Sequence, residues 1–306
     1  MTQETLGAVM AFGTACCWCL SAVAFEGASR RAGSVPVNLW RLVVAFLMLA
    51  AAGVIGRGMP LPNDATPHHW KWLLLSGLVG FFIGDITLFR AFVLMGARLT
   101  TLVTCTAPIF TLAAELLTLP STHVGPLHVL GICVTIAGVG WVVLERREVG
   151  PHSRANAAGI LLATAGAAGQ GIGAVLTAKA FQSAPYDAFA AGQIRMLSAM
   201  AAVACFIVAT GRVRDTLAAL KSGPTMGLLT LGAFWGPFLG VTLFIQSLNY
   251  VPPSTTQTIT SLMPVLIIPL AVLIRKERVS PRAILGACVA VAGVWMLIYA
   301  SSHGRS

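Results

Sequence analysis

The chain has 306 residues, of which 57% are hydrophobic and only 10% are charged, and its mean hydropathy is +0.83. Because soluble domains carry about 25% charged residues, this composition excludes an ordinary soluble domain and predicts a protein embedded in lipid. We attribute the net charge of +10 to loop arginines at the headgroup level, which orient membrane proteins, and we expect no binding of nucleic acid.

Ten apolar segments follow one another along the chain. A helix needs about 20 apolar residues to cross a bilayer, and each segment is about that long. The first half holds segments at about 6–27, 35–55, 70–94, 100–119 and 126–144. After a polar linker, the second half holds segments at about 157–181, 188–210, 226–250, 254–274 and 282–300. The sequence therefore predicts an all-α integral membrane protein with about ten transmembrane helices and short loops.

The two halves repeat each other. Residues 80–108 align without a gap with residues 236–264, and LGICVTIAGV at 130–139 returns as LGACVAVAGV at 285–294. We therefore predict a first repeat over 1–148 and a second over 149–306. An odd number of spans in each repeat inverts the second relative to the first. This plan is typical of secondary transporters, with a central cavity near the midplane, and it places both termini on one side.

Small residues and prolines recur at matching places in the two repeats. Each repeat has a Gly-x-x-x-Gly motif and, further on, a proline in its fourth segment; these residues are Gly80, Gly84, Pro108, Gly236, Gly240 and Pro264. The glycines let helix backbones approach closely, or they line the cavity and bend there. Each proline removes one backbone hydrogen bond, which is consistent with a static kink or with a hinge for alternating access.

Ionisable residues within apolar segments are the stronger functional signal, because each is costly in lipid unless paired or hydrated. Arg41 and Arg195 occupy matching places early in the second segment of each repeat, where each either reaches the membrane interface or faces the cavity. Asp85 and Glu115 align with apolar residues of the other repeat, so the fold does not require them. They are candidates for substrate binding or proton coupling, or for ion pairs with Arg90 and Arg98, respectively.

Polar and aromatic side chains at membrane depth complete the predicted cavity. A pocket of indole and amide groups suits small polar metabolites, although ordinary helix–helix hydrogen bonding is an alternative for each residue. The candidate cavity residues are Trp18, Asn38, Arg41, Asp85, Arg90, Gln170, Arg195, Trp235, Gln246 and Asn249.

Nothing in the sequence favours catalysis or a bound cofactor. We find no metal-binding histidine pair, nucleophile elbow or phosphate-binding loop on a suitable segment. The seven cysteines lie in apolar segments without zinc-site spacing. We therefore expect a protein that is not an enzyme and that has no metal and no cofactor.

The ordered set of motifs, present twice, resembles permeases of the drug/metabolite transporter superfamily with two EamA-like repeats. The matching features are a tryptophan in the first helix, an arginine opening the second, a glycine-rich third, a proline in the fourth and the L-G-x-x-x-x-x-x-G-V pattern of the fifth. The family's glutamate after the fourth helix is matched by Glu277 but is absent from the first repeat. The resemblance implies ten helices around a cavity and transport of small metabolites, often export of amino acids or related compounds.

These features predict a secondary transporter working by alternating access in the bacterial inner (plasma) membrane, as a monomer or homodimer. A passive channel and a non-transporting membrane scaffold are the alternatives. The orientation is ambiguous, because family members usually keep both termini in the cytoplasm whereas the positive-inside rule places them outside. Four cations fall on the side of the termini: Arg57, Lys71, Lys179 and Arg305. Thirteen fall on the other side: Arg30, Arg31, Arg98, Arg146, Arg147, Arg154, Arg212, Arg214, Lys221, Arg275, Lys276, Arg278 and Arg282.

Overall fold

The computed structural model describes residues 2–119, 125–145, 157–266 and 280–303, and within these ranges all regular structure is helical. The first repeat contains α1 (Gln3–Ala32), α2 (Ser34–Arg57), α3 (Pro67–Gly77), η1 (Leu78–Gly84), α4 (Asp85–Thr104), α5 (Ala107–Thr118) and α6 (Pro126–Glu145). The second contains α7 (Ala157–Ala180), α8 (Ala188–Ala209), α9 (Val213–Ala218), η2 (Ala219–Lys221), α10 (Gly223–Ala233), η3 (Phe234–Gly240), α11 (Val241–Ser247), α12 (Pro253–Thr260) and α14 (Pro281–His303).

The prediction of an all-α membrane protein is confirmed. Nine helical stretches of the described residues are long and apolar enough to cross a bilayer. The predicted segment at 254–274 is described only to residue 266, where α12 is followed by a short helical stretch over 263–266. The linker between the repeats, where we predicted the boundary at 148 and 149, lies outside the described residues, as does Glu277.

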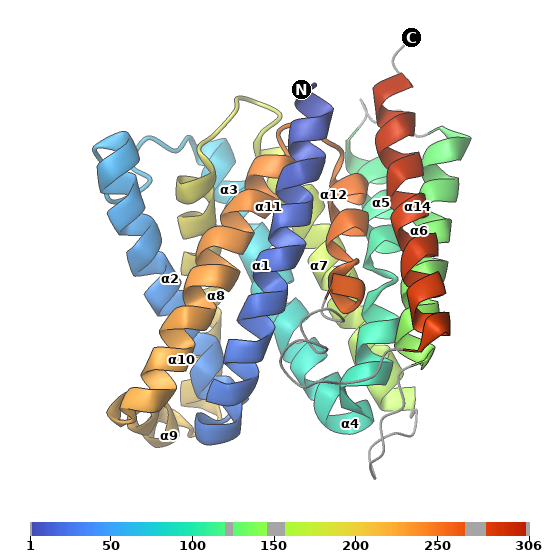
Figure 1. The fold of residues 1–306 in the computed structure, drawn as a ribbon. Helices are drawn as coiled ribbons and strands as arrows, with labels where there is room; N and C mark the ends of the chain where they lie inside the picture. The colour runs from blue at the N-terminus through green and yellow to red at the C-terminus, as the bar shows by residue number, and fades with distance from the viewer. Residues whose placement is uncertain (1, 120–124, 146–156, 267–279, 304–306) are drawn as a thin grey trace.

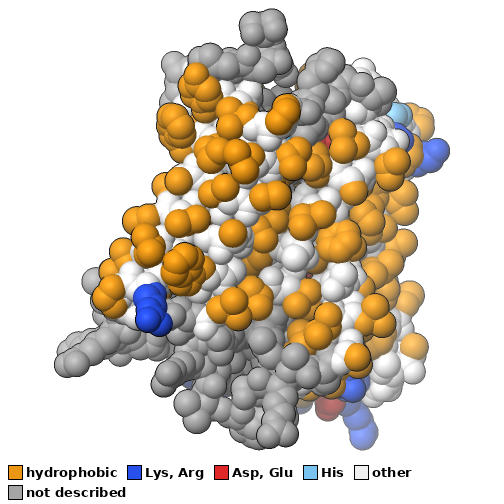
Figure 2. Space-filling view, turned by 90° about the vertical axis from the view of Figure 1, so that its right-hand side faces the viewer, with side chains coloured by type: hydrophobic (Ala, Val, Ile, Leu, Met, Phe, Trp, Pro, Cys, Tyr) orange, Lys and Arg blue, Asp and Glu red, His pale blue; other side chains and the backbone are white. Residues whose placement is uncertain are grey.

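The two repeats run in opposite directions through the bundle. In Figure 1, α1 descends from the N-terminus while its counterpart α7 ascends, and α6 descends while α14 ascends. The beginning of α1 and the end of α14 consequently lie at the same end of the bundle, which we call the terminal end. One side of the molecule is a broad apolar surface with lysine and arginine side chains only at its margins (Figure 2), as a lipid-facing surface requires.

The third span of each repeat contains a π-helical stretch at the Gly-x-x-x-Gly motif. The π-helix η1 lies between α3 and α4, and η3 lies between α10 and α11. Such wider turns are rare and are frequently found at functional sites. Pro237 inside η3 cannot donate a backbone hydrogen bond, which favours a local departure from the α-helix. The sequence leaves close packing and bending open at these glycines, and the structure has a π-helix at the matching positions of both repeats.

The fourth span of each repeat is broken just before its proline. In the first repeat, α4 keeps helical backbone across residues 95–99, where the sequence predicts a break between two segments, and ends at Thr104; α5 then begins at Ala107. Pro108 therefore lies in the first turn of α5, where backbone N–H groups have no intrahelical acceptor. Pro264 likewise follows a turn at Ser261 and Leu262. The prolines begin helices rather than kink them, so the predicted mid-helix kink is wrong.

Glycines bring the two repeats into close contact. A Cβ on Gly173 of α7 would lie 3.0 Å from the Cα of Gly80, and one on Gly169 would lie 3.0 Å from the Cα of Gly84. The second repeat mirrors this arrangement, since a Cβ on Gly236 would lie 2.3 Å from Oγ of Ser21 in α1. Each π-helix thus packs against the first helix of the other repeat.

Replacing Gly77 with alanine is expected to destabilise the protein. The added Cβ would lie 2.0 Å from the carbonyl oxygen of Arg195, so α3 and α8 must separate, and overpacking of this kind costs about 1–3 kcal/mol. The measurement is the thermal denaturation midpoint in detergent. Gly227→Ala is the matched control, because a Cβ there meets nothing within 4 Å and alanine favours a helix. Equal midpoints for the two variants would contradict this packing.

Candidate functional site: a cavity between the repeats

A cavity of about 230 Å³ lies between the two repeats. Its walls come from α1, α2, η1, α4, α7, α8, η3, α11 and α12, together with the stretch after α12. Seven of the residues that the sequence analysis placed at the cavity or its hinges line it: Trp18, Arg41, Gly80, Asp85, Gln170, Arg195 and Gly236.

Matching positions of the two repeats build much of this cavity. The matched pairs in the lining are Gly80 with Gly236, Phe81 with Pro237, Asp85 with Val241, Leu88 with Phe244, and Arg41 with Arg195. The cavity therefore has an approximate twofold symmetry in position but not in chemistry. Its asymmetry is concentrated at Asp85, which has an apolar counterpart.

Asp85 forms an ion pair across the cavity wall with Arg41. The carboxylate accepts a hydrogen bond from Nη2 of Arg41, while Nε of Arg41 donates to Oδ1 of Asn38 over 2.9 Å. Asn38 is buried behind the pair and does not line the cavity. Because η1 ends immediately before Asp85, the π-helix positions this carboxylate at the cavity.

Arg195 presents the second positive charge. Its side chain extends from α8, is only 4% exposed, and places its guanidinium carbon 4.5 Å from the centroid of the Phe81 ring. Within the described part of the chain, Nε and Nη1 of Arg195 have no hydrogen-bond partner. Asp85 also lines the cavity, but its ion pair is with Arg41. Both arginines thus line the cavity, which is one of the two alternatives open from sequence.

The remaining walls are mainly apolar. The rings of Trp18 and Phe244 stack with centroids 5.7 Å apart, and Phe25, Leu42 and Met263 also line the cavity. Two amides, those of Gln170 and Gln257, interrupt this surface, and neither side chain has a hydrogen bond within the described residues. The site thus combines aromatic faces, two amides and three charged groups.

Besides Asn38, five of the predicted cavity and proton-coupling residues lie elsewhere. Arg90 is exposed on α4, so the ion pair that the sequence suggested between it and Asp85 is made by Arg41 instead. Trp235 contacts Phe234 edge to face, Nε2 of Gln246 donates to the hydroxyl of Tyr250 over 3.3 Å, and Asn249 is exposed. Glu115 is fully buried at an inter-repeat contact, where Oε2 accepts from the backbone N of Ser254 over 2.9 Å. None of the five lines the cavity.

Sequence reasoning missed Gln257 and the aromatic residues Phe25, Phe81 and Phe244. Aromatic side chains are common in apolar segments, so they carry no signal by themselves. The repeat could have indicated two of them. Phe81 directly follows Gly80 of the repeated motif, and Phe244 is the counterpart of Leu88 in the other repeat.

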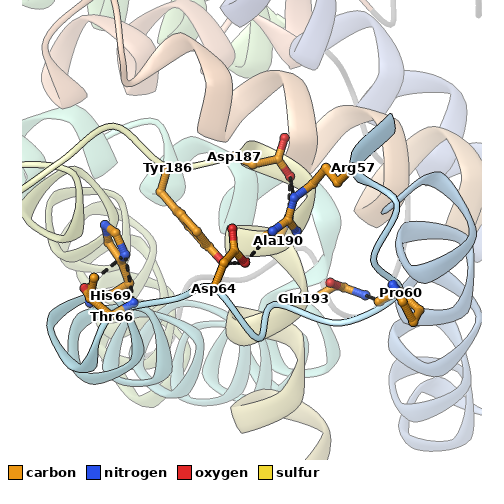
Figure 3. A network of polar contacts seen from close by, with 9 residues as sticks. All are labelled: Arg57, Pro60, Asp64, Thr66, His69, Tyr186, Asp187, Ala190 and Gln193. Atoms are coloured by element: carbon orange, nitrogen blue, oxygen red, sulfur yellow. Dashed lines mark hydrogen bonds and ion pairs between the residues drawn. The ribbon is translucent and has the colours of Figure 1, made fainter. Parts of the chain in front are cut away.

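A polar cluster joins the two repeats at the terminal end (Figure 3). Arg57, at the end of α2, pairs with Asp64, and its Nε lies 3.7 Å from Oδ1 of Asp187. The hydroxyl of Tyr186 donates to Oδ1 of Asp64 over 2.9 Å, and the Tyr186 ring stacks on His69. We call these five residues the clasp. It connects the loop between α2 and α3 with the loop between α7 and α8.

Further contacts extend the connection around the clasp. One ring nitrogen of His69 lies 3.2 Å from the carbonyl oxygen of Ala184, while Nδ1 lies 3.1 Å from the Thr66 hydroxyl. Gln193, fully enclosed on α8, donates from Nε2 to the carbonyl of Pro60 over 2.8 Å. Loops of different repeats are thus held together at the terminal end by both charge and backbone contacts.

The clasp is expected to weaken in acid. Partial burial raises the pKa of Asp64, but hydrogen bonds from Arg57 and Tyr186 outweigh it and hold the pKa below its ordinary value. Asp64 then stabilises the fold above its ordinary pKa of about 3.9, and this contribution is lost as the pH falls through the lowered pKa.

Asp64→Asn should therefore lower the thermal midpoint at pH 7, by an amount matching roughly 0.5–1 kcal/mol because the site is partly exposed. The difference from the wild type should shrink as the pH falls below about 4 and should disappear only below the lowered pKa of Asp64 in the folded protein. Asp215→Asn, at an exposed site on α9, is the control and should change little at either pH. A difference between Asp64→Asn and the wild type that is the same at both pH values would contradict the role of the ionised carboxylate.

The fold and the cavity together define a class of protein, the multi-pass helical membrane proteins built from two inverted repeats around a central cavity. The chain belongs to the EamA-like transporter family, whose model matches residues 5–144 and again residues 157–299. One solved structure, whose title reads only "Crystal structure of protein", superposes with a TM-score of 0.73. It is 17% identical, the match covers 98% of this chain and 99% of that one, and the likeness shows the fold alone. No curated protein matches the sequence significantly.

Proposed function

We propose that the protein is a secondary transporter that moves small amphipathic metabolites, of the class that includes amino acids and related compounds, by alternating access of its two repeats. The observation that carries this proposal is the cavity itself. It lies between inverted repeats and is lined by matching positions of both, such as Arg41 and Arg195. Its volume of about 230 Å³ is below the roughly 300–1,000 Å³ of pockets for drug-sized ligands, which favours a small metabolite.

The inverted repeats provide a physical route for alternation. If the repeats exchange their conformations, the end of the bundle at which the cavity opens is exchanged as well. In this proposal the clasp is the contact that must break for opening at the terminal end. The π-helices η1 and η3 are the segments proposed to change, because π-helical turns are rare and frequently lie at functional sites. Asp85 is the candidate for proton coupling at the cavity.

Transport by purified protein in liposomes tests the proposal. We expect saturable uptake of at least one member of an amino-acid and metabolite panel, and stimulation of that uptake when the same solute is preloaded inside. A passive channel would show no such counterflow. A membrane scaffold would move no solute under any ion gradient, and that result would contradict the proposal.

We also propose that the protein resides in a bacterial inner membrane, works as an exporter and has its termini on the outer side. The charge distribution supports this orientation, because four lysine and arginine residues fall on the side of the termini and thirteen on the other. A C-terminal fusion to a reporter that is active only in the cytoplasm should be silent. An active reporter would reverse the assignment of sides.

A further inference from the structure

Arg195 is a buried cation, and two of its three guanidinium nitrogens make no hydrogen bond within the described residues. It is 4% exposed and lines the cavity, and Nε and Nη1 have no hydrogen-bond partner in the described part of the chain. Leaving donors of a charged group unpaired and buried is costly. The Phe81 ring covers the guanidinium face, but this contact does not engage the N–H groups, which project in the guanidinium plane.

The charges around the cavity favour an anion over a cation or a zwitterion. The described lining residues include two guanidinium groups and one carboxylate. That carboxylate, Asp85, already holds Arg41. An ammonium group entering the cavity would find no free carboxylate among these residues, whereas an anion would meet Arg195, whose Nε and Nη1 are unpaired within the described residues.

The other walls indicate what carries this anionic group. The stacked pair of Trp18 and Phe244, together with Leu42 and Val241, presents an apolar surface. Gln170 and Gln257 supply amides that can donate to a second oxygen. A ligand complementary to this site has one charged end and an apolar body.

We infer that the cavity recognises an amphipathic organic monoanion, a carboxylate on an apolar body, and that Arg195 binds its charged end. This inference rests on the proposed transport function and narrows its substrate class to monoanions among the related compounds, in preference to the zwitterionic amino acids. A guanidinium suits the task because its planar N–H groups match the geometry of a carboxylate. Arg41 remains with Asp85 in this arrangement, so Arg195 is the specificity-determining residue of the pair.

Four compounds on one six-carbon skeleton test the inference by thermal shift in a neutral detergent: hexanoate, hexanamide, hexylamine and norleucine. A ligand that binds the folded state raises its apparent stability with concentration. Hexanoate should bind at least about tenfold more tightly than the other three, as expected for the loss of a charged hydrogen bond. Arg195→Gln should remove this preference and Arg195→Lys should keep part of it. Arg212→Gln, at an exposed site, should leave it unchanged.

The wild-type series is informative even if Arg195→Gln fails to fold. Equal binding of all four compounds, or tighter binding of norleucine or hexylamine than of hexanoate, would overturn the inference. So would an unchanged hexanoate preference in folded Arg195→Gln. Hexanoate binding that depends on Arg195 without any translocation in liposomes would support this inference and contradict the proposed transport function. Transport of another solute without hexanoate binding would support the proposed transport function and contradict this inference.

Discussion

Asp85→Asn is expected to lower stability by roughly 3 kcal/mol, near the low end of the 3–5 kcal/mol lost when one partner of a buried ion pair is removed. The low end applies because the side chains of Arg41 and Asp85 remain 16% and 12% exposed to the cavity. The variant leaves two arginines, Arg41 and Arg195, without a carboxylate among the described lining residues. A thermal midpoint lower by about 5–10 °C in detergent is the expected result.

A second substitution distinguishes the lost ion pair from a general disturbance of the site. Asp85→Asn with Arg41→Gln removes both charges of this ion pair, so part of the lost stability should return. Arg90→Gln removes an exposed arginine of the same helix and should be nearly neutral. The pairing would be refuted if the double variant were less stable than Asp85→Asn alone, or if Arg90→Gln were as harmful.

The partner of Asp85 shows why sequence predicts the fold better than the site. The membrane spans and the internal repeat depend only on the order of residues along the chain, so the sequence predicts them directly. From sequence, the only visible partner for Asp85 was Arg90, five residues along the same helix. The actual partner, Arg41, comes from another span, and its position depends on how α2 packs against α8 and η3. Such contacts between helices leave no local signal.

The backbone breaks illustrate a similar limit. The Gly-x-x-x-Gly motifs predicted close approach, and Gly80 and Gly84 do contact α7 closely. The wider turns of the π-helices depend on packing between helices, and the only local sign of them in the sequence is Pro237. Pro108 was misinterpreted because a proline within an apolar run can either kink a helix or begin one. The choice depends on where the preceding helix ends, here Thr104.

Glu115 was a sequence candidate for proton coupling, and its place in the fold leads to a different expectation. It is fully buried on α5 in the first repeat, and its carboxylate caps the N-terminus of α12 in the second through the backbone N of Ser254. The Ser254 hydroxyl is also 3.2 Å from Nε2 of His128. Negative charge is stabilising at a helix N-terminus, so this contact ties the two repeats together away from the cavity.

Glu115→Ala should therefore lower stability by about 1.5–3 kcal/mol, the range for a hydrogen bond to a charged group. Glu115→Gln retains an oxygen acceptor for Ser254 and should lose clearly less. Thermal midpoints compare the two variants, and transport as a function of pH provides the second readout. A residue that carries the coupled proton would lose pH dependence in Glu115→Gln whatever its stability, whereas a cap would keep it. We expect Glu115→Gln to keep the wild-type pH profile, because a carboxylate that does not line the cavity and is bonded to a helix terminus stabilises the contact between the repeats without meeting the substrate.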